Sequence, residues 1–255
     1  MSARPRVLLP RPEGSGDALV ERLRADGLDV DHHPFLDLAP EHDADIREAV
    51  ADLAAGRFAW LVLTSPAAID ALDFFDGSEA ARGVRFTIPA GTRTAVVGRG
   101  TAETLRERGY EPDLVAHGSG ASLVAQMPPA DTDGSGNRPA VLFPASSAAA
   151  PTVPEGLAAA GYAVRREIAY RPVSRSVPPA VVERLRTGGY DAIVLTSSMI
   201  ARLASALAIA LTTKVVTIGE PTTLAAREAG LRVDVQAEEP STAGLAAAVH
   251  RALAP

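Results

Sequence analysis

The chain contains no cysteine, which excludes disulfide bonds, thiolate nucleophiles and cysteine-ligated metal sites. Aromatic residues make up only 4% of the sequence, so its cores must be built from alanine, valine and leucine. Lysine is almost missing too, since Lys214 is the one lysine among 25 basic residues. No apolar run approaches membrane-spanning length, and the short, proline-broken N-terminus is unlike a secretory signal. We therefore expect a soluble, cytoplasmic protein with no membrane partner.

Enough apolar material remains for two domains of ordinary size. The chain has 255 residues, of which 47% are hydrophobic. Its formal charge is −6 and its basic residues are scattered, so a nucleic-acid partner is not expected. The histidines do not have the spacing of metal ligands, so no metal site is expected either.

An internal repeat supports the two-domain expectation. Phe58–Ser65 reads FAWLVLTS and Tyr190–Ser197 reads YDAIVLTS, and each is an apolar strand that ends in Thr-Ser before a helical pattern. A second motif has a threonine three residues and a glycine eleven residues after its first glycine, and it occurs at Gly98, Thr101 and Gly109 and again at Gly219, Thr222 and Gly230. One βα architecture therefore occurs twice, and a ligand between the copies would be bound from two sides.

Short β-rich runs alternate with helical patterns along the chain, which predicts an α/β fold with parallel sheets. Two longer extended segments, 28–38 and 163–173, interrupt the alternation. Four strand–helix units lie between them, one lies before the first and three lie after the second. Two equal domains result if the N-terminal unit joins the last three. We therefore expect a discontinuous outer domain of residues 1–34 and 172–255, an inner domain of residues 37–168, and an antiparallel hinge ladder formed by the two long segments.

Parallel sheets bind ligands beyond the carboxyl ends of their strands, where helix N-termini offer unpaired N–H groups. Four turns place hydroxyls or glycine there, and they are our candidate binding positions for an anionic ligand: Thr64 and Ser65, Gly98 and Thr101, Thr196 and Ser197, Gly219 and Thr222. The alternative is that the serines and threonines are ordinary helix N-caps, each stabilising the protein by about 1 kcal/mol. Neither glycine motif matches a phosphate-binding loop, so nucleotide binding is weakly supported.

Tyr170 is the candidate catalytic residue. It lies in the second long segment, which would line the space between the domains. Its phenol can donate a proton or a hydrogen bond to a ligand oxygen. The alternative is a tyrosine that only packs across the hinge.

Taken in order, the motifs resemble those of the uroporphyrinogen-III synthase family. The similar segments cover nearly the whole chain: VLLPRP (7–12), VLTSPAAIDAL (62–72), VVGRGTAETLRERG (96–109), AYRPV (169–173), IVLTSS (193–198), TIGEPTTLAAREAGL (217–231) and EEPSTAGLAAAV (238–249). Pro144–Ser147 departs from the family pattern, because it lacks the arginine or glycine often found after that strand. Glu220 also departs, since it replaces the proline usual after Gly219.

The resemblance implies two flavodoxin-like α/β domains joined by a two-stranded β-ladder, with the N-terminal strand in the C-terminal domain. It implies an enzyme that closes hydroxymethylbilane, a linear tetrapyrrole, to uroporphyrinogen III with loss of water and inversion of ring D. This reaction belongs to heme, siroheme and cobalamin biosynthesis and uses no metal or organic cofactor. The implied partner is the small-molecule tetrapyrrole, and transient contact of a monomer with the preceding deaminase is a further hypothesis.

Residue by residue, the resemblance places Tyr170 on the tyrosine proposed as the family's proton donor. It places Arg11 on the arginine after strand one, and it matches the family's turn threonines and strand-end serines with Thr101, Thr222, Ser65 and Ser197. Two other hypotheses stay open. One is a non-catalytic module that binds a tetrapyrrole or another polyanion, and the other is a flavodoxin-like nucleotide protein.

Overall fold

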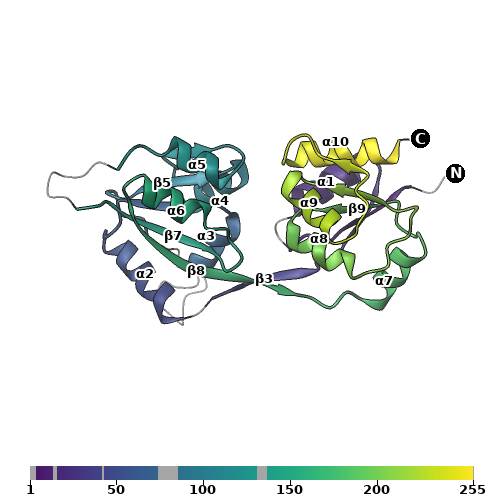
Figure 1. Cartoon of the computed structure of the whole chain (residues 1–255), viewed down its shortest axis with the longest axis horizontal. Coiled ribbons are helices and arrows are strands. Elements are labelled where there is room, and N and C mark those ends of the chain that lie inside the picture. The colour runs from purple at the N-terminus through teal and green to yellow at the C-terminus, as the bar shows by residue number, and fades with distance from the viewer. Residues whose placement is uncertain (1–3, 14–15, 42, 74–85, 131–136, 255) are drawn as a thin grey trace. The chain divides into compact units, whose positions relative to one another are not determined.

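The computed structural model describes residues 4–13, 16–41, 43–73, 86–130 and 137–254. The chain divides into two compact units, which we call the first unit (Met1–Asp37 with Val173–Pro255) and the second unit (Leu38–Pro172). Each unit contains one sheet that is predominantly parallel and is flanked by helices, so the fold is α/β (Figure 1). The chain crosses from one unit to the other inside the two long segments that interrupt the βα alternation.

The first unit contains a five-stranded sheet in the order β11-β10-β9-β1-β2. Its strands are β1 (Arg6–Leu9), β2 (Asp29–His32), β9 (Ala192–Leu195), β10 (Lys214–Thr217) and β11 (Val235–Gln236). Its helices are α1 (Asp17–Ala25), α7 (Pro179–Arg186), α8 (Ser198–Ser205), α9 (Glu220–Glu228) and α10 (Thr242–Leu253). Helices α1 and α10 pack side by side (Figure 1) and bury their apolar residues with Val7 and Leu9 of the interior strand β1. The N-terminal strand is therefore part of this unit's core.

The second unit contains a six-stranded sheet in the order β3-β8-β7-β4-β5-β6. Its strands are β3 (Leu36–Pro40), β4 (Trp60–Leu63), β5 (Arg93–Val97), β6 (Leu114–Ala116), β7 (Ala140–Ser146) and β8 (Ala163–Ser174). Its helices are α2 (Ala44–Ala54), α3 (Pro66–Leu72), α4 (Arg99–Glu107), α5 (Gly120–Gln126) and α6 (Thr152–Ala159). Strand β4 is completely buried, as the apolar run WLVL predicts for a central parallel strand.

Strands β3 and β8 form the ladder where the chain passes between the units. The Arg175 N–H donates to the Phe35 carbonyl at 2.9 Å, and the Glu41 N–H donates to the Ala169 carbonyl at 2.9 Å. Residue numbers thus rise on one strand as they fall on the other, which is antiparallel pairing. Only the later part of segment 28–38 belongs to this ladder, because Asp29–His32 is strand β2 and pairs in parallel with β1.

The repeat extends to strand register. Val7 on β1 lies opposite Ala192 on β9, and Val141 on β7 lies opposite Trp60 on β4. Trp60 and Ala192 are both the third residue of the repeated strand motif, so Val7 and Val141 occupy equivalent positions and β1 and β7 are equivalent interior strands.

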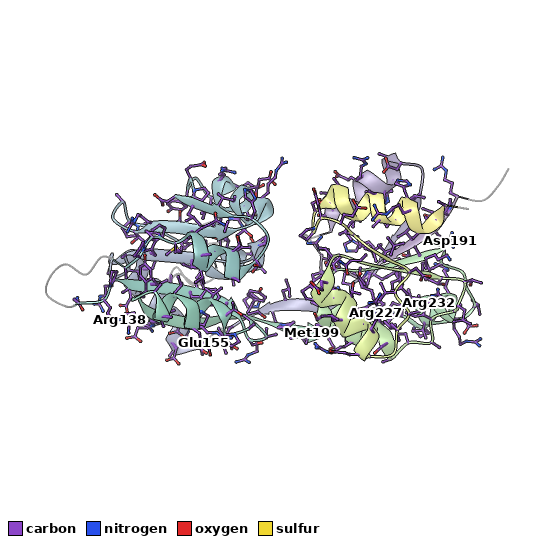
Figure 2. The ribbon with its side chains drawn as sticks, turned by 45° about the horizontal axis from the view of Figure 1, so that its top comes forward. Arg138, Glu155, Asp191, Met199, Arg227 and Arg232 are labelled. Atoms are coloured by element: carbon purple, nitrogen blue, oxygen red, sulfur yellow. The ribbon has the colours of Figure 1, made fainter. Side chains whose placement is uncertain are left out.

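Buried polar contacts repeat as well. The Thr92 hydroxyl donates to the Phe58 carbonyl at 2.7 Å, and the Thr213 hydroxyl donates to the Tyr190 carbonyl at 2.8 Å. Asp191, labelled in Figure 2, comes just before β9 and accepts a hydrogen bond from the Arg6 N–H at 2.7 Å. The two threonine hydroxyls pair with carbonyls that would be costly to bury alone, whereas the Arg6–Asp191 hydrogen bond is exposed and has no counterpart at Ala59.

Candidate functional site

In the second unit, Thr64 and Ser65 follow the carboxyl end of β4. Ser65 has extended backbone angles and caps helix α3, because its hydroxyl oxygen accepts a hydrogen bond from the Ala68 N–H at 3.3 Å. Pro66 at the first helical position fits the start of a helix, where no N–H partner is needed. The strand-end serine is therefore an N-cap, as the alternative interpretation of the motif predicts, and its hydroxyl proton is still available to a second partner.

Gly98 and Thr101 follow the neighbouring strand β5. Gly98 begins helix α4 with a φ of 80°, a conformation that glycine adopts without strain. Thr101 lies in the first turn of α4 and is 3% exposed. Its hydroxyl makes no hydrogen bond to any residue that the structure describes, so it can bond to a ligand.

Tyr170 lies on β8 in the same sheet, and its phenol oxygen is 2.9 Å from the Ser65 hydroxyl. The side chain is 9% exposed and packs with the apolar core of the unit. Burial raises the pKa of Tyr170 above its ordinary value, and the nearby hydroxyls of Ser65 and Ser146 partly oppose this effect. The phenol is thus protonated at neutral pH and can act as a donor.

Ser146, the last residue of β7, lies beside Tyr170 in the sheet, and the motifs do not single it out. Ser146 pairs with Tyr170 on β8. Its strand, β7, lies between β8 and β4, and Ser65 follows β4. Its segment departs from the family pattern, so resemblance gave no signal for it. Counting residues along two regular strands would not pair Ser146 with Tyr170 either, because the register of β7 and β8 shifts by one residue just before this pair.

In the first unit, Thr196 and Ser197 follow the carboxyl end of β9. Ser197 caps helix α8 by accepting a hydrogen bond from the Ile200 N–H at 3.2 Å, as Ser65 does for α3. The Ser198 hydroxyl donates to the Pro221 carbonyl at 3.1 Å, which holds the starts of α8 and α9 together. Two helix N-termini, with their unpaired N–H groups, therefore lie next to each other.

Gly219 and Thr222 lie at the start of α9. Gly219 has an extended backbone with a φ of 173°, so this turn does not depend on glycine. Thr222 is 3% exposed, and its hydroxyl bonds to none of the described residues. Lys214, by contrast, begins β10 at the opposite edge of the sheet, with its Nζ 4.0 Å from Asp234. The structure thus separates Lys214 from the candidate positions.

Arg11 follows β1 at the same edge of the first sheet. Its side chain is half-buried, and burial lowers its pKa. Its guanidinium forms no ion pair with any described carboxylate. A poorly solvated cation without a counter-ion is costly, and an anionic ligand would relieve that cost.

The candidate residues therefore form two sets. Thr64, Ser65, Gly98, Thr101 and Tyr170 lie at the carboxyl edge of the second sheet, and Arg11, Thr196, Ser197, Gly219 and Thr222 lie at that of the first. That both sets bind one ligand stays a prediction. The described residues contain no cluster of acidic or histidine side chains suited to a metal ion. None of the described helices has the length and apolarity that a membrane span requires.

Comparison with known proteins identifies the family. The family described as "Uroporphyrinogen-III synthase HemD" matches residues 6–247. Among solved structures, a mutant uroporphyrinogen III synthase from Thermus thermophilus is 23% identical, with a TM-score of 0.62 and coverage of 98% of both chains. A uroporphyrinogen-III synthetase from Helicobacter pylori is 13% identical, with a TM-score of 0.64 and coverage of 99% of this chain and 100% of that one. These two structures have the same fold. No curated protein sequence matches significantly.

The family match spans almost the whole chain, including both strand-end motifs, both glycine motifs and the segment that carries Tyr170. The chain therefore belongs to the uroporphyrinogen-III synthase family.

Proposed function

We propose that this protein catalyses its family's reaction with Tyr170 as the proton donor. The family closes hydroxymethylbilane to uroporphyrinogen III with loss of water and inversion of ring D, a step of tetrapyrrole biosynthesis. The observation that carries the assignment of Tyr170 is its buried, protonated phenol at the carboxyl edge of the second sheet, 2.9 Å from Ser65.

The substrate has many carboxylates, whereas the protein has a net charge of −6, so long-range attraction does not explain binding. Local donors must supply the affinity. A hydrogen bond to a charged group contributes about 1.5–3 kcal/mol, so a few such bonds offset the cost of ordering a flexible chain. We propose that Thr101 in the second unit, and Ser197, Thr222 and the neighbouring helix N–H groups in the first unit, bind carboxylates of one substrate molecule.

Arg11 is the charged member of this proposed set. Its guanidinium has no acidic partner among the described residues, and it can form two parallel hydrogen bonds with a carboxylate. In the repeat, the equivalent of Arg11 is Ala145, which has no polar side chain. We therefore assign charge recognition to the first unit and proton donation to the second.

Tyr170 would act when the substrate loses its hydroxyl group. Hydroxide is a poor leaving group, and a proton delivered to the departing oxygen lets it leave as water. A positioned general acid accelerates such a step by about 10²–10⁴. The bilane also closes without ring inversion on its own, so the binding groups must in addition hold the one folded geometry that leads to isomer III.

We also propose that each unit is a flavodoxin-like domain. Numbered along the first unit, its strands run 2-1-3-4-5 across the sheet, which is the flavodoxin order. The second unit has the same order in its strands β8-β7-β4-β5-β6 if β7 is counted as the first strand. Its strand order is therefore a circular permutation of that of the first unit. The lack of cysteine suits a cytoplasmic enzyme, which we expect to be a monomer. Transient contact with the preceding deaminase stays a prediction.

The test is an assay on freshly prepared hydroxymethylbilane, with the heat-denatured protein as control. We expect isomer III in excess over isomer I, which forms spontaneously. Isomer I alone, at the rate of the control, would instead support the non-catalytic binding module.

A further inference from the structure

We propose that Ser146 is a positioning residue that acts through the Tyr170 hydroxyl, so that Ser65 and Ser146 together aim the phenol proton at the substrate. The inference rests on the proposed role of Tyr170 as proton donor. It is carried by a β-bulge, by two serine hydroxyls at adjacent strand ends, and by a difference between the two units.

The bulge decides where Tyr170 points. Along β7 and β8 the pairing is regular up to Ala145 opposite Ile168, and the next pair is Ser146 opposite Tyr170. Ala169 is therefore the extra residue. In a regular strand successive side chains point to opposite faces, yet Ala169 and Tyr170 are both buried in the same core cluster. A bulge re-aims a side chain in this way, and here it brings the phenol to the face that carries Ser65.

Each of the two serine hydroxyl oxygens accepts a hydrogen bond from a backbone N–H group. Ser65 accepts a hydrogen bond from the Ala68 N–H at 3.3 Å, and Ser146 accepts one from the Ala148 N–H at 3.2 Å. Each hydroxyl then has its own proton left to donate. If both donate to the phenol oxygen, the proton of Tyr170 has no acceptor in this cluster and is directed to a ligand.

The energetics agree with this arrangement. A phenol oxygen that accepts two hydrogen bonds holds developing negative charge better than one that accepts none. Both serines lower the pKa of Tyr170 against the effect of burial, so they make the buried phenol a better acid. A tyrosine buried without these serines would be protonated but would be a weaker acid.

The first unit shows that the fold does not require this serine. Matching Val7 with Val141 by their equivalent pairings makes Pro12 the counterpart of Ser146. Proline has no side-chain hydroxyl, although the matching strand-end serine, Ser197, is present and caps its helix. The hydroxyl at position 146 thus occurs in the unit that contains Tyr170.

The first experiment is a double-mutant cycle on the rate of isomer III formation, with wild type, Ser146→Ala, Tyr170→Phe and the double variant. We expect Ser146→Ala to lower kcat about 2- to 12-fold, the loss of one hydrogen bond, with KM unchanged. It should have no further effect in the Tyr170→Phe background, and Ser146→Thr, which keeps the hydroxyl, should restore the rate.

Three outcomes would overturn the inference. An unchanged kcat in Ser146→Ala, beside a slow Tyr170→Phe variant, removes Ser146 from the mechanism. An equal loss from Ser146→Ala in both backgrounds means that Ser146 does not act through the tyrosine. If Tyr170→Phe turns over as fast as wild type, the proposed role of the tyrosine fails and this inference fails with it, while formation of isomer III would still support the family reaction.

The second experiment reads the phenol without any turnover. The chain has four tyrosines, so 3-fluorotyrosine labelling gives few ¹⁹F resonances, and the Tyr170 signal is the one lost in Tyr170→Phe. Fluorination also makes phenols more acidic, which brings the titration into a range where the fold survives. We expect Ser146→Ala to move the Tyr170 titration to higher pH and the neighbouring control Ser147→Ala to leave it in place. A titration that does not move in Ser146→Ala would contradict the proposed hydrogen bond.

Discussion

Replacing Arg11 by glutamine should raise stability and weaken substrate binding at the same time. The guanidinium is half-buried, burial lowers its pKa, and no described carboxylate compensates its charge. Removing an uncompensated charge of this kind should add about 0.5–2 kcal/mol to the free energy of unfolding. Losing a charge-assisted bond of about 1.5–3 kcal/mol to a substrate carboxylate should raise KM about 10- to 150-fold.

Two measurements on Arg11→Gln test this, urea unfolding of the free protein and initial rates of isomer III formation across bilane concentrations. Arg138, labelled in Figure 2, offers a matched control. Its guanidinium donates to the Ala158 carbonyl at 2.6 Å and the Gly161 carbonyl at 3.0 Å, at the end of α6. Arg138→Gln should therefore lose stability and leave KM unchanged. If Arg11→Gln behaves like this control, Arg11 is a structural residue and the reasoning is refuted.

Three further predictions concern Tyr170, Tyr190 and the repeated threonines. Tyr170→Phe should lower kcat for isomer III by about 10²–10⁴ in steady-state assays with the circular dichroism spectrum unchanged; normal turnover would remove its proton from the mechanism. Burial and a 2.6 Å hydrogen bond to Asp31 raise the pKa of Tyr190 from 10.0 to about 12. The folded state thus favours the neutral phenol. The free energy of unfolding of wild type in urea should therefore exceed that of Tyr190→Phe by its full amount below pH 10, and the difference should decline from pH 10 to 12. A difference that stays constant with pH would contradict this. Thr92→Val and Thr213→Val each leave a buried carbonyl unpaired and should each cost about 1–3 kcal/mol in the same assay, and a cost in one variant alone would break the equivalence of the repeats.

The α/β fold follows from the alternation of apolar runs with helical patterns, because buried parallel strands and their crossover helices need these patterns. The run WLVL at Trp60–Leu63 predicts a central strand, and β4 is one. The shared Thr-Ser ending predicts that helices begin after Ser65 and Ser197, and both serines are N-caps. Local chemistry is sufficient for such features because neighbouring residues decide them.

The arrangement around Tyr170 could not be derived in this way. A bulge depends on the pairing of β8 with β7, whose residues are more than twenty positions apart, and no local pattern marks Ala169 as the extra residue. Ser146 was missed for the same reason. The sequence predicts a hinge ladder near segment 28–38, but the first half of this segment is strand β2, which pairs with β1. That pairing depends on which edge of the sheet is free, and the segment's own residues do not specify it.

Hydrogen exchange with and without uroporphyrinogen III, kept anaerobic, tests most directly whether the carboxyl edges of both sheets bind one tetrapyrrole. The amides to follow are those at the starts of α4, α8 and α9, the helices that begin after Gly98, Ser197 and Gly219. We predict that the product slows exchange at all three helix starts, in both units, and that Arg11→Gln weakens the protection. Protection confined to one unit, or found only away from these turns, would contradict the account.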